Sequence, residues 1–173
     1  MKRSELYPMP EYFDRYILLA DDIEMLEALQ ISLHELENIP LGLWQSLGNQ
    51  VYAPGKWTIK DLMQHMIDTE RIFSYRAVSF ARGDEQVPLY DEDEFAKNAH
   101  ANERTLDALI AEAIALRKST IHLFQSFTDD MLAKLGNGFK GEYSVHAIGF
   151  ILAGHQRWHF KVIEEKYLPL LKV

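Results

Sequence analysis

Helical periodicity in four long segments is the feature that most constrains how this chain of 173 residues can fold. In each segment apolar residues recur at spacings of three and four, the pattern of a helix with one buried face. The segments are residues 21–40, 58–83, 103–127 and 144–167. We find no credible strand pattern between them. The sequence therefore predicts an all-α fold, an antiparallel four-helix bundle.

Residue types typical of helix starts support these limits. Asp21 with Asp22 precedes the first segment, and Ser144 precedes the fourth. Thr58, with Asp61 three residues later, resembles a capping box at the start of the second. Pro40, Gly83 and Pro169 lie at or just beyond the ends of three of the segments, where proline or glycine would end a helix.

The length suits one domain with a sizeable core, so we treat 1–173 as a single bundle domain. Residues 1–20 form an N-terminal extension, rich in tyrosine and phenylalanine, that we expect to pack on the bundle. Apolar residues make up 47% of the chain and charged residues 25%, the balance of an ordinary soluble protein.

Charge and targeting patterns narrow the partners and the compartment. The net charge is −8, and lysines and arginines are scattered singly, so no basic stripe is available to neutralise a nucleic-acid backbone. No apolar run is long enough for a membrane span, and the N-terminus lacks the apolar core of a signal peptide. We therefore expect a cytoplasmic protein that binds neither nucleic acid nor membrane.

His155 and His159 are the first candidates for a functional site. Positions four apart on an α-helix differ by only about 40° in direction, so both imidazoles lie on one face. The apolar residues around them, among them Ile151 and Leu152, share that face, so both rings should point at the core. A buried imidazole pair without partners is costly, whereas a shared metal ion would satisfy one nitrogen of each ring.

Such a pair also occurs by chance, and a third ligand is needed to favour a metal. The chain has no cysteine, so histidine, aspartate or glutamate must supply it. His34 and His122 lie toward polar faces, and His146 lies on the opposite face of the helix from His155. His65, midway along the second helix and off its polar face, is the preferred third ligand. The residue after His155 is glutamine, so the pair is not the HExxH motif of metalloproteases.

Two further groups of residues carry weaker expectations. Glu70 and Arg117 both fall on apolar faces, on different helices, which suggests a buried ion pair. Asp61 and Asp68 flank His65 by one turn and are candidates to orient its ring, although two solvated carboxylates are the commoner arrangement. Trp158 could form a wall of the site, but core packing is the more usual role of such a tryptophan.

Several ordered pieces of the sequence resemble one known family. They include Pro54-Gly55-Lys56-Trp57-Thr58, His65 with Asp68-Thr69-Glu70-Arg71, Ala81-Arg82-Gly83-Asp84, Ala115-Leu116-Arg117 and Ala153-Gly154-His155 with His159. Spread over residues 52–168, this pattern is similar to the DinB/YfiT-like family of damage-inducible bacterial proteins. It is far more specific than the spacing of two histidines.

The resemblance implies a four-helix bundle with a three-histidine site for a divalent metal, and the matching positions are His65, His155 and His159. The metal would be Zn or Ni, with Fe or Mn as alternatives. Some relatives are metal-dependent transferases or isomerases that use low-molecular-weight thiols, and others are described as hydrolases. The resemblance therefore suggests an enzyme that activates water or a small thiol, and a homodimer with a role in the stress response. The alternative is a non-catalytic bundle in which the metal holds helices together.

Overall fold

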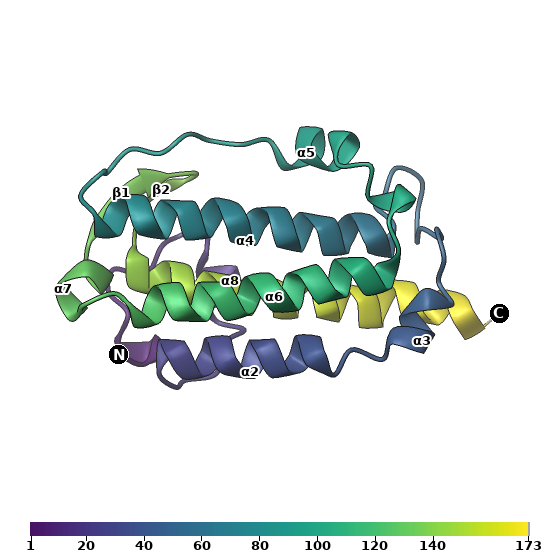
Figure 1. Ribbon diagram of the computed structural model, residues 1–173, viewed down its shortest axis with the longest axis horizontal. Helices are drawn as coiled ribbons and strands as arrows, with labels where there is room; N and C mark the ends of the chain where they lie inside the picture. Colours follow the sequence, from purple (N-terminus) through teal and green to yellow (C-terminus); the bar gives the residue numbers. More distant parts are fainter. Residues whose placement is uncertain (173) are drawn as a thin grey trace.

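Four long helices form the body of the protein, and the computed structural model describes residues 1–172 (Figure 1). The helices are α2 (Met25–Glu37), α4 (Ile59–Ala81), α6 (Leu106–Gln125) and α8 (Val145–Val162). Helices α2 and α8 run in one direction, and α4 and α6 run in the other (Figure 1). Both α2 and α4 pack against α6 and α8, so α2 and α4 lie diagonally across the bundle although they are successive long helices. The predicted all-α four-helix bundle is confirmed.

Shorter elements connect and cover the long helices. They are η1 (Arg3–Glu5), α1 (Asp14–Ile17), α3 (Leu41–Gln45), α5 (Glu92–Asn98), η2 (Ala101–Glu103), α7 (Asp129–Leu132), the π-helical turn η3 (Ile163–Tyr167) and η4 (Leu168–Lys172). Helices α3 and α7 lie at opposite ends of the bundle (Figure 1). The chain that leads from α4 to α5 runs back along α4 (Figure 1), so it covers part of the helix that carries His65.

Side-chain caps fix where two of the long helices begin, as predicted. The Thr58 hydroxyl accepts a hydrogen bond from the Asp61 backbone N–H (3.2 Å), and the Asp61 carboxylate accepts one from the Thr58 backbone N–H (2.9 Å). The Ser144 hydroxyl accepts from the backbone N–H of Ala147 at 3.0 Å. Each cap satisfies backbone donors that the first turn leaves unpaired.

The predicted cap at Asp21 and Asp22 was wrong. Helix α2 begins at Met25, with Glu24 as its N-cap residue. The Asp22 carboxylate instead accepts from the backbone N–H of Ser4 at 2.8 Å. Asp21 binds a side chain from α8, so both acidic groups bind other parts of the fold and neither caps α2.

A small hairpin corrects the expectation that the chain has no strand. Strands β1 (Leu135–Gly138) and β2 (Gly141–Ser144) pair antiparallel, with Leu135 opposite Ser144. Both turn residues have a positive φ, 64° at Lys140 and 115° at Gly141. Glycine adopts such values without strain, which suits position 141. Each strand has only four residues, too few for an alternating pattern to stand out in the sequence.

The apolar core is divided into two clusters by a band of buried polar side chains. One cluster includes Phe73, Phe80 and Phe124, and the other includes Met63 and Leu109. Each long helix contributes to the polar band at a position between the clusters, and the members include Ser32, Glu70, Arg117, His155 and Gln156.

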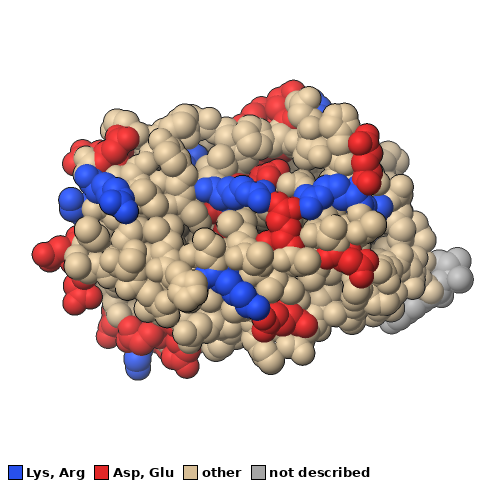
Figure 2. Space-filling model, in the orientation of Figure 1, with Lys and Arg blue, Asp and Glu red and all other residues tan. Residues whose placement is uncertain are grey.

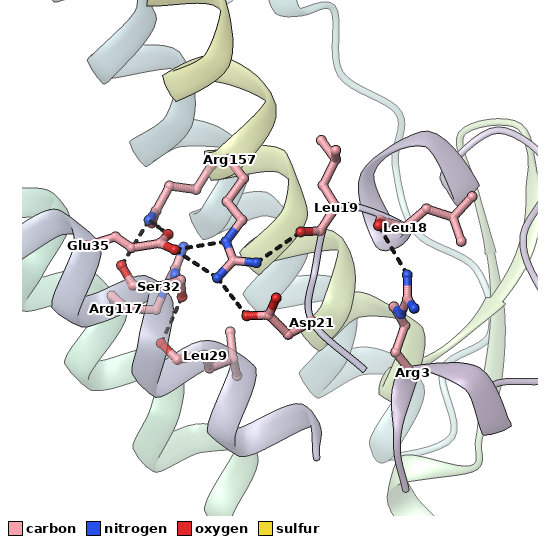
Figure 3. Close-up of polar contacts among 10 residues, drawn as sticks. Arg3, Leu18, Leu19, Asp21, Leu29, Ser32, Glu35, Arg117 and Arg157 are labelled. Carbon is pink, nitrogen blue, oxygen red and sulfur yellow. Dashed lines mark hydrogen bonds and ion pairs between the residues drawn. The ribbon is translucent and has the colours of Figure 1, made fainter. Parts of the chain in front are cut away.

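The predicted ion pair lies in this band. Arg117 and Glu70 are only 3% and 5% exposed, and the guanidinium donates two hydrogen bonds to the carboxylate, at 2.8 and 2.9 Å. Arg117 also donates to the hydroxyl of Ser32, which in turn donates to the carbonyl of Leu29 (Figure 3). The pair therefore ties α2, α4 and α6 together at mid-height.

The N-terminal residues contribute to the core as well as covering the bundle. Leu6, Phe13 and Ile17 are buried in the first apolar cluster. Gly154 of α8 lies so close to this segment that a Cβ there would be 1.8 Å from the carbonyl oxygen of Tyr16. A glycine at this position lets the two backbones approach.

Arg157 of α8 holds the same segment through hydrogen bonds and ion pairs. It donates to Glu35 of α2 at 2.8 Å, to the carbonyl of Leu19 at 3.0 Å and to Asp21 at 2.9 Å (Figure 3). One side chain of α8 therefore joins the end of the N-terminal segment to α2.

Charged side chains of both signs are interspersed on the face of the molecule shown in Figure 2, without a continuous basic stripe on that face. Within residues 1–172, none of the helices combines the length and the apolar character needed to span a membrane.

Candidate metal centre

Three histidine side chains converge inside the bundle, one from α4 and two from α8. The Nε2 atom of His155 lies 3.1 Å from Nε2 of His65 and 3.0 Å from Nε2 of His159. One ligand atom from each ring can be chosen so that all three lie within 4.8 Å of one another. The rings are 6%, 6% and 8% exposed for His65, His155 and His159. The structure thus brings together the three histidines singled out in the sequence.

Burial keeps these imidazoles neutral. Desolvation lowers the pKa of His65 to about 4 and, with the nearby His65 ring, that of His159 to about 3. For His155 desolvation is again the largest cause, followed by the charges that His159 and His65 would carry, and its pKa falls well below the ordinary value. A neutral imidazole has a lone pair free to bind a metal without first losing a proton.

The donor set suits a divalent transition metal. Imidazole nitrogens bind Zn²⁺ at about 2.0–2.1 Å, so nitrogens a few ångströms apart can share one ion. In a neutral cluster only one member of each facing pair of nitrogens can donate a proton, so the three rings cannot fully satisfy one another. An ion would accept lone pairs from all three. The residues present therefore fit a metal.

Aromatic rings orient two of the histidines. The Trp57 ring lies 4.8 Å from the ring of His65, and Tyr16 meets His155 edge to face at 5.1 Å. These contacts limit the rotation of both imidazoles and shield them from water. The Nδ1 atom of His159 is buried without a hydrogen-bond partner among the described residues.

Neither carboxylate proposed to orient His65 does so. Asp61 accepts from the Thr58 hydroxyl at 2.8 Å and from the Asn102 amide at 3.1 Å, and Asp68 accepts from the Gln64 amide at 3.0 Å. Within residues 1–172 no hydrogen bond joins either one to His65. Helical spacing placed both near that ring, but caps and neighbouring side chains engage them instead.

Trp158 does not pack in the core, contrary to the more usual role considered for it. Its side chain is 39% exposed, and its ring meets that of Tyr16 edge to face at 5.6 Å. It lines a recess of about 270 Å³ that also contains His159 and Trp57. The idea that Trp158 forms a wall beside the site therefore matches its position better than core packing does.

A second cavity, of about 300 Å³, extends from His155 along α4. Its lining includes Tyr16 and Phe13 from the N-terminal segment, Thr69 and Arg76 from α4, and further side chains from the segment leading to α5, the hairpin and α8. Loop and helix thus enclose a space with one of the three histidines in its wall. A volume of about 300 Å³ lies in the size range of small-molecule sites.

Sequence reasoning did not assign functional positions to Thr69, Phe73 or Arg76. They follow His65 at four, eight and eleven residues, a spacing that keeps them on one face of α4. That periodicity could have identified them. Tyr90 and Glu92 also line the cavity, but they lie in the segment before and at the start of α5, where no helical repeat predicts direction.

Comparison with known proteins places the chain in a family. The family model described as the DinB superfamily matches residues 24–163. No curated protein matches the chain.

Among solved structures, YfiT from Bacillus subtilis is similar to this chain, with a TM-score of 0.68 and 16% sequence identity over 92% of this chain and 89% of YfiT. YfiT is described as a probable metal-dependent hydrolase with an unusual four-helix bundle topology. At this identity the likeness shows a shared fold.

Proposed function

The chain belongs to the DinB superfamily, and from that premise we propose that it binds one divalent metal ion through His65, His155 and His159 and uses it as an enzyme. The reaction would be hydrolysis or transfer of a small thiol. The observation that carries the proposal is the buried cluster of three neutral imidazoles with a cavity of about 300 Å³ at its edge.

Three protein ligands leave coordination positions free, as in catalytic rather than structural sites. When bound, a divalent ion would lower the pKa of a water molecule or thiol and so supply a nucleophile near neutral pH. We propose Zn or Ni as the ion, with Fe or Mn as alternatives, because the affinity order of nitrogen sites makes the choice depend on supply.

The chain's own residues would hold the ion and shape the space beside it. The three imidazoles are supplied by α4 and α8, which pack directly against each other. Trp57 and Tyr16 fix ring orientations and exclude water. The low exposure of the cluster strengthens any electrostatic interaction within it, because the surrounding dielectric is lower than that of water.

Metal analysis of the untagged protein tests the assignment. We expect close to one ion per chain in the parent and loss of the ion in His65→Ala and in His155→Ala. His34→Ala is the matched control, because His34 is an exposed histidine on α2 and its loss should leave the metal content unchanged. A parent protein that takes up no metal, even after reconstitution, would show that the site assignment is wrong.

The alternative is a metal that only joins α4 to α8, which the position of the three ligands also allows. Chelation separates the two functions. For the enzyme, we expect the chelated protein to keep its helical circular dichroism at 25 °C and to lose hydrolytic or thiol-transfer activity found by substrate screening. Unfolding on chelation, with no activity in the loaded protein, would favour the structural role.

A further inference from the structure

Among residues 1–172, Arg76 is a buried cation with no buried anion to match it. Its side chain is 1% exposed. It donates to the Tyr143 hydroxyl at 3.1 Å and to the Pro88 carbonyl at 3.3 Å, and its Nε has no partner among the described residues. Within residues 1–172 no carboxylate lies within 4.0 Å of its guanidinium, whereas the equally buried Arg117 has Glu70. A guanidinium buried with only neutral acceptors keeps most of its desolvation cost.

Arg76 lines the same cavity as His155. Arg76 follows His65 by eleven residues on α4, which corresponds to a rise of about 16 Å along the helix. Thr69 and Phe73 lie between them on the same face and also line the cavity. The cavity therefore has His155, one member of the three-histidine cluster, in its wall, and also Arg76, which has no carboxylate partner within residues 1–172.

The other walls of this cavity are largely apolar and aromatic. They are formed by Phe13, Phe73, Ile151, Tyr16, Tyr90 and Phe139. The Arg76 guanidinium lies 4.9 Å from the centre of the Phe73 ring, which shields the cation but supplies no negative charge. An apolar body with one anionic end would match this arrangement.

Acidic residues limit the charge that the cavity accepts. Asp91 and Glu92 line it from the start of α5, and both are exposed residues. Asp93 follows them directly, so three consecutive carboxylates concentrate negative charge at this part of the cavity rim. A ligand with a second negative charge would be repelled by these groups.

We propose that Arg76 binds the carboxylate of a small monoanionic substrate with an apolar body, whose other end reaches the three-histidine cluster. The reactive role of that other end rests on the proposed function. The carboxylate site does not, because a guanidinium recognises a carboxylate through paired hydrogen bonds whether or not a metal is present.

Binding to the chelator-treated, metal-free protein tests this directly. The probes are 4-phenylbutyrate, its neutral amide 4-phenylbutyramide, and phenyl phosphate as a dianion, measured by isothermal titration calorimetry. We expect the parent to prefer the carboxylate over the amide by roughly tenfold or more, the size of a charge-assisted hydrogen bond. Phenyl phosphate should bind more weakly than the carboxylate.

Three variants assign the preference to Arg76. Arg76→Gln should bind acid and amide equally, and Arg76→Lys should keep part of the preference because it keeps the charge. Arg82→Gln is the matched control, an exposed arginine just after α4, and should behave as the parent does. Thermal unfolding checks that each variant is folded, and if Arg76→Gln is not, the reduced preference of Arg76→Lys decides the question.

Equal affinity of the parent for acid and amide would overturn the proposal, as would no binding of either probe. It would also be overturned by an unchanged preference in Arg76→Gln or by tighter binding of phenyl phosphate. Metal content separates this result from the proposed function. A parent that prefers the carboxylate but takes up no metal would leave the carboxylate site standing and remove the metal site.

Discussion

At the scale of single residues, the polar band shows which side-chain positions a sequence pattern can predict. Glu70 and Arg117 were paired from helical direction alone, and the structure joins them by two hydrogen bonds. The inward direction of His155 follows from the same geometry, whereas His65 was preferred by elimination among the histidines and matched by the family resemblance. Asp61, by contrast, is held by Asn102, a residue on a connection whose path no helical repeat determines.

Glu70→Ala should lower the free energy of unfolding by about 3–5 kcal/mol, because it leaves the Arg117 guanidinium buried and unpaired. Arg117→Met should cost a similar amount. The double variant Glu70→Leu with Arg117→Met should be more stable than either single variant, since no buried charge is left uncompensated. Urea denaturation measures all three.

The exposed pair between Lys118 and Glu37 is the control for this experiment. Breaking it with Lys118→Ala should change stability by less than about 1 kcal/mol, because solvent screens surface ion pairs. A double variant in the core no more stable than its single variants would contradict mutual dependence of Glu70 and Arg117.

At the scale of elements, the four long helices were predictable because their apolar repeats and two of their caps are local in sequence. The β1–β2 hairpin was missed, since four-residue strands carry almost no repeat. The start of α2 was misplaced because Asp21 and Asp22 bind distant partners, Arg157 and Ser4. Local patterns therefore predicted the long helices, but neither the short strands nor the partners of acidic residues outside the helices.

The close contact between α8 and the N-terminal segment gives a prediction at this scale. Gly154→Ala should lower the free energy of unfolding by about 1–3 kcal/mol, even though alanine favours helix, because its Cβ would overlap the Tyr16 carbonyl. Gly42→Ala in α3 is the control, since a Cβ there meets nothing within 4 Å. It should be neutral or stabilising by up to about 1 kcal/mol. Thermal denaturation distinguishes them, and equal effects would argue against the contact.

At the scale of the whole molecule, residues 1–20 were expected to pack on the bundle, and they also supply core side chains such as Phe13 and Ile17. They further provide Tyr16, which touches His155. The interpretation of 1–173 as one domain stays a prediction. The dimer, the stress-response role and the cytoplasmic location also stay predictions, because they depend on other molecules or on the cell.

Arg157 gives a prediction about how this N-terminal segment is held. Arg157→Gln should reduce the protection of backbone amides in residues 14–22 from hydrogen exchange, because it removes the contacts with Leu19 and Asp21. The cost to global stability should be about 1–2 kcal/mol, since the side chain is 24% exposed and its ion pairs are partly screened. Lys161→Gln, an exposed position on the same helix, is the control. Unchanged protection in Arg157→Gln would show that apolar packing alone holds the segment.

His65 on α4 lies 90 residues before His155 on α8, and His159 follows four residues after His155. The ribosome therefore synthesises His65 well before it synthesises His155 and His159. While the chain is being made, α4 can offer only a single imidazole, too little to retain an ion against cellular chelators. Metal binding would thus be a late step of maturation, and a nascent chain that stalls before α8 would hold no metal ion.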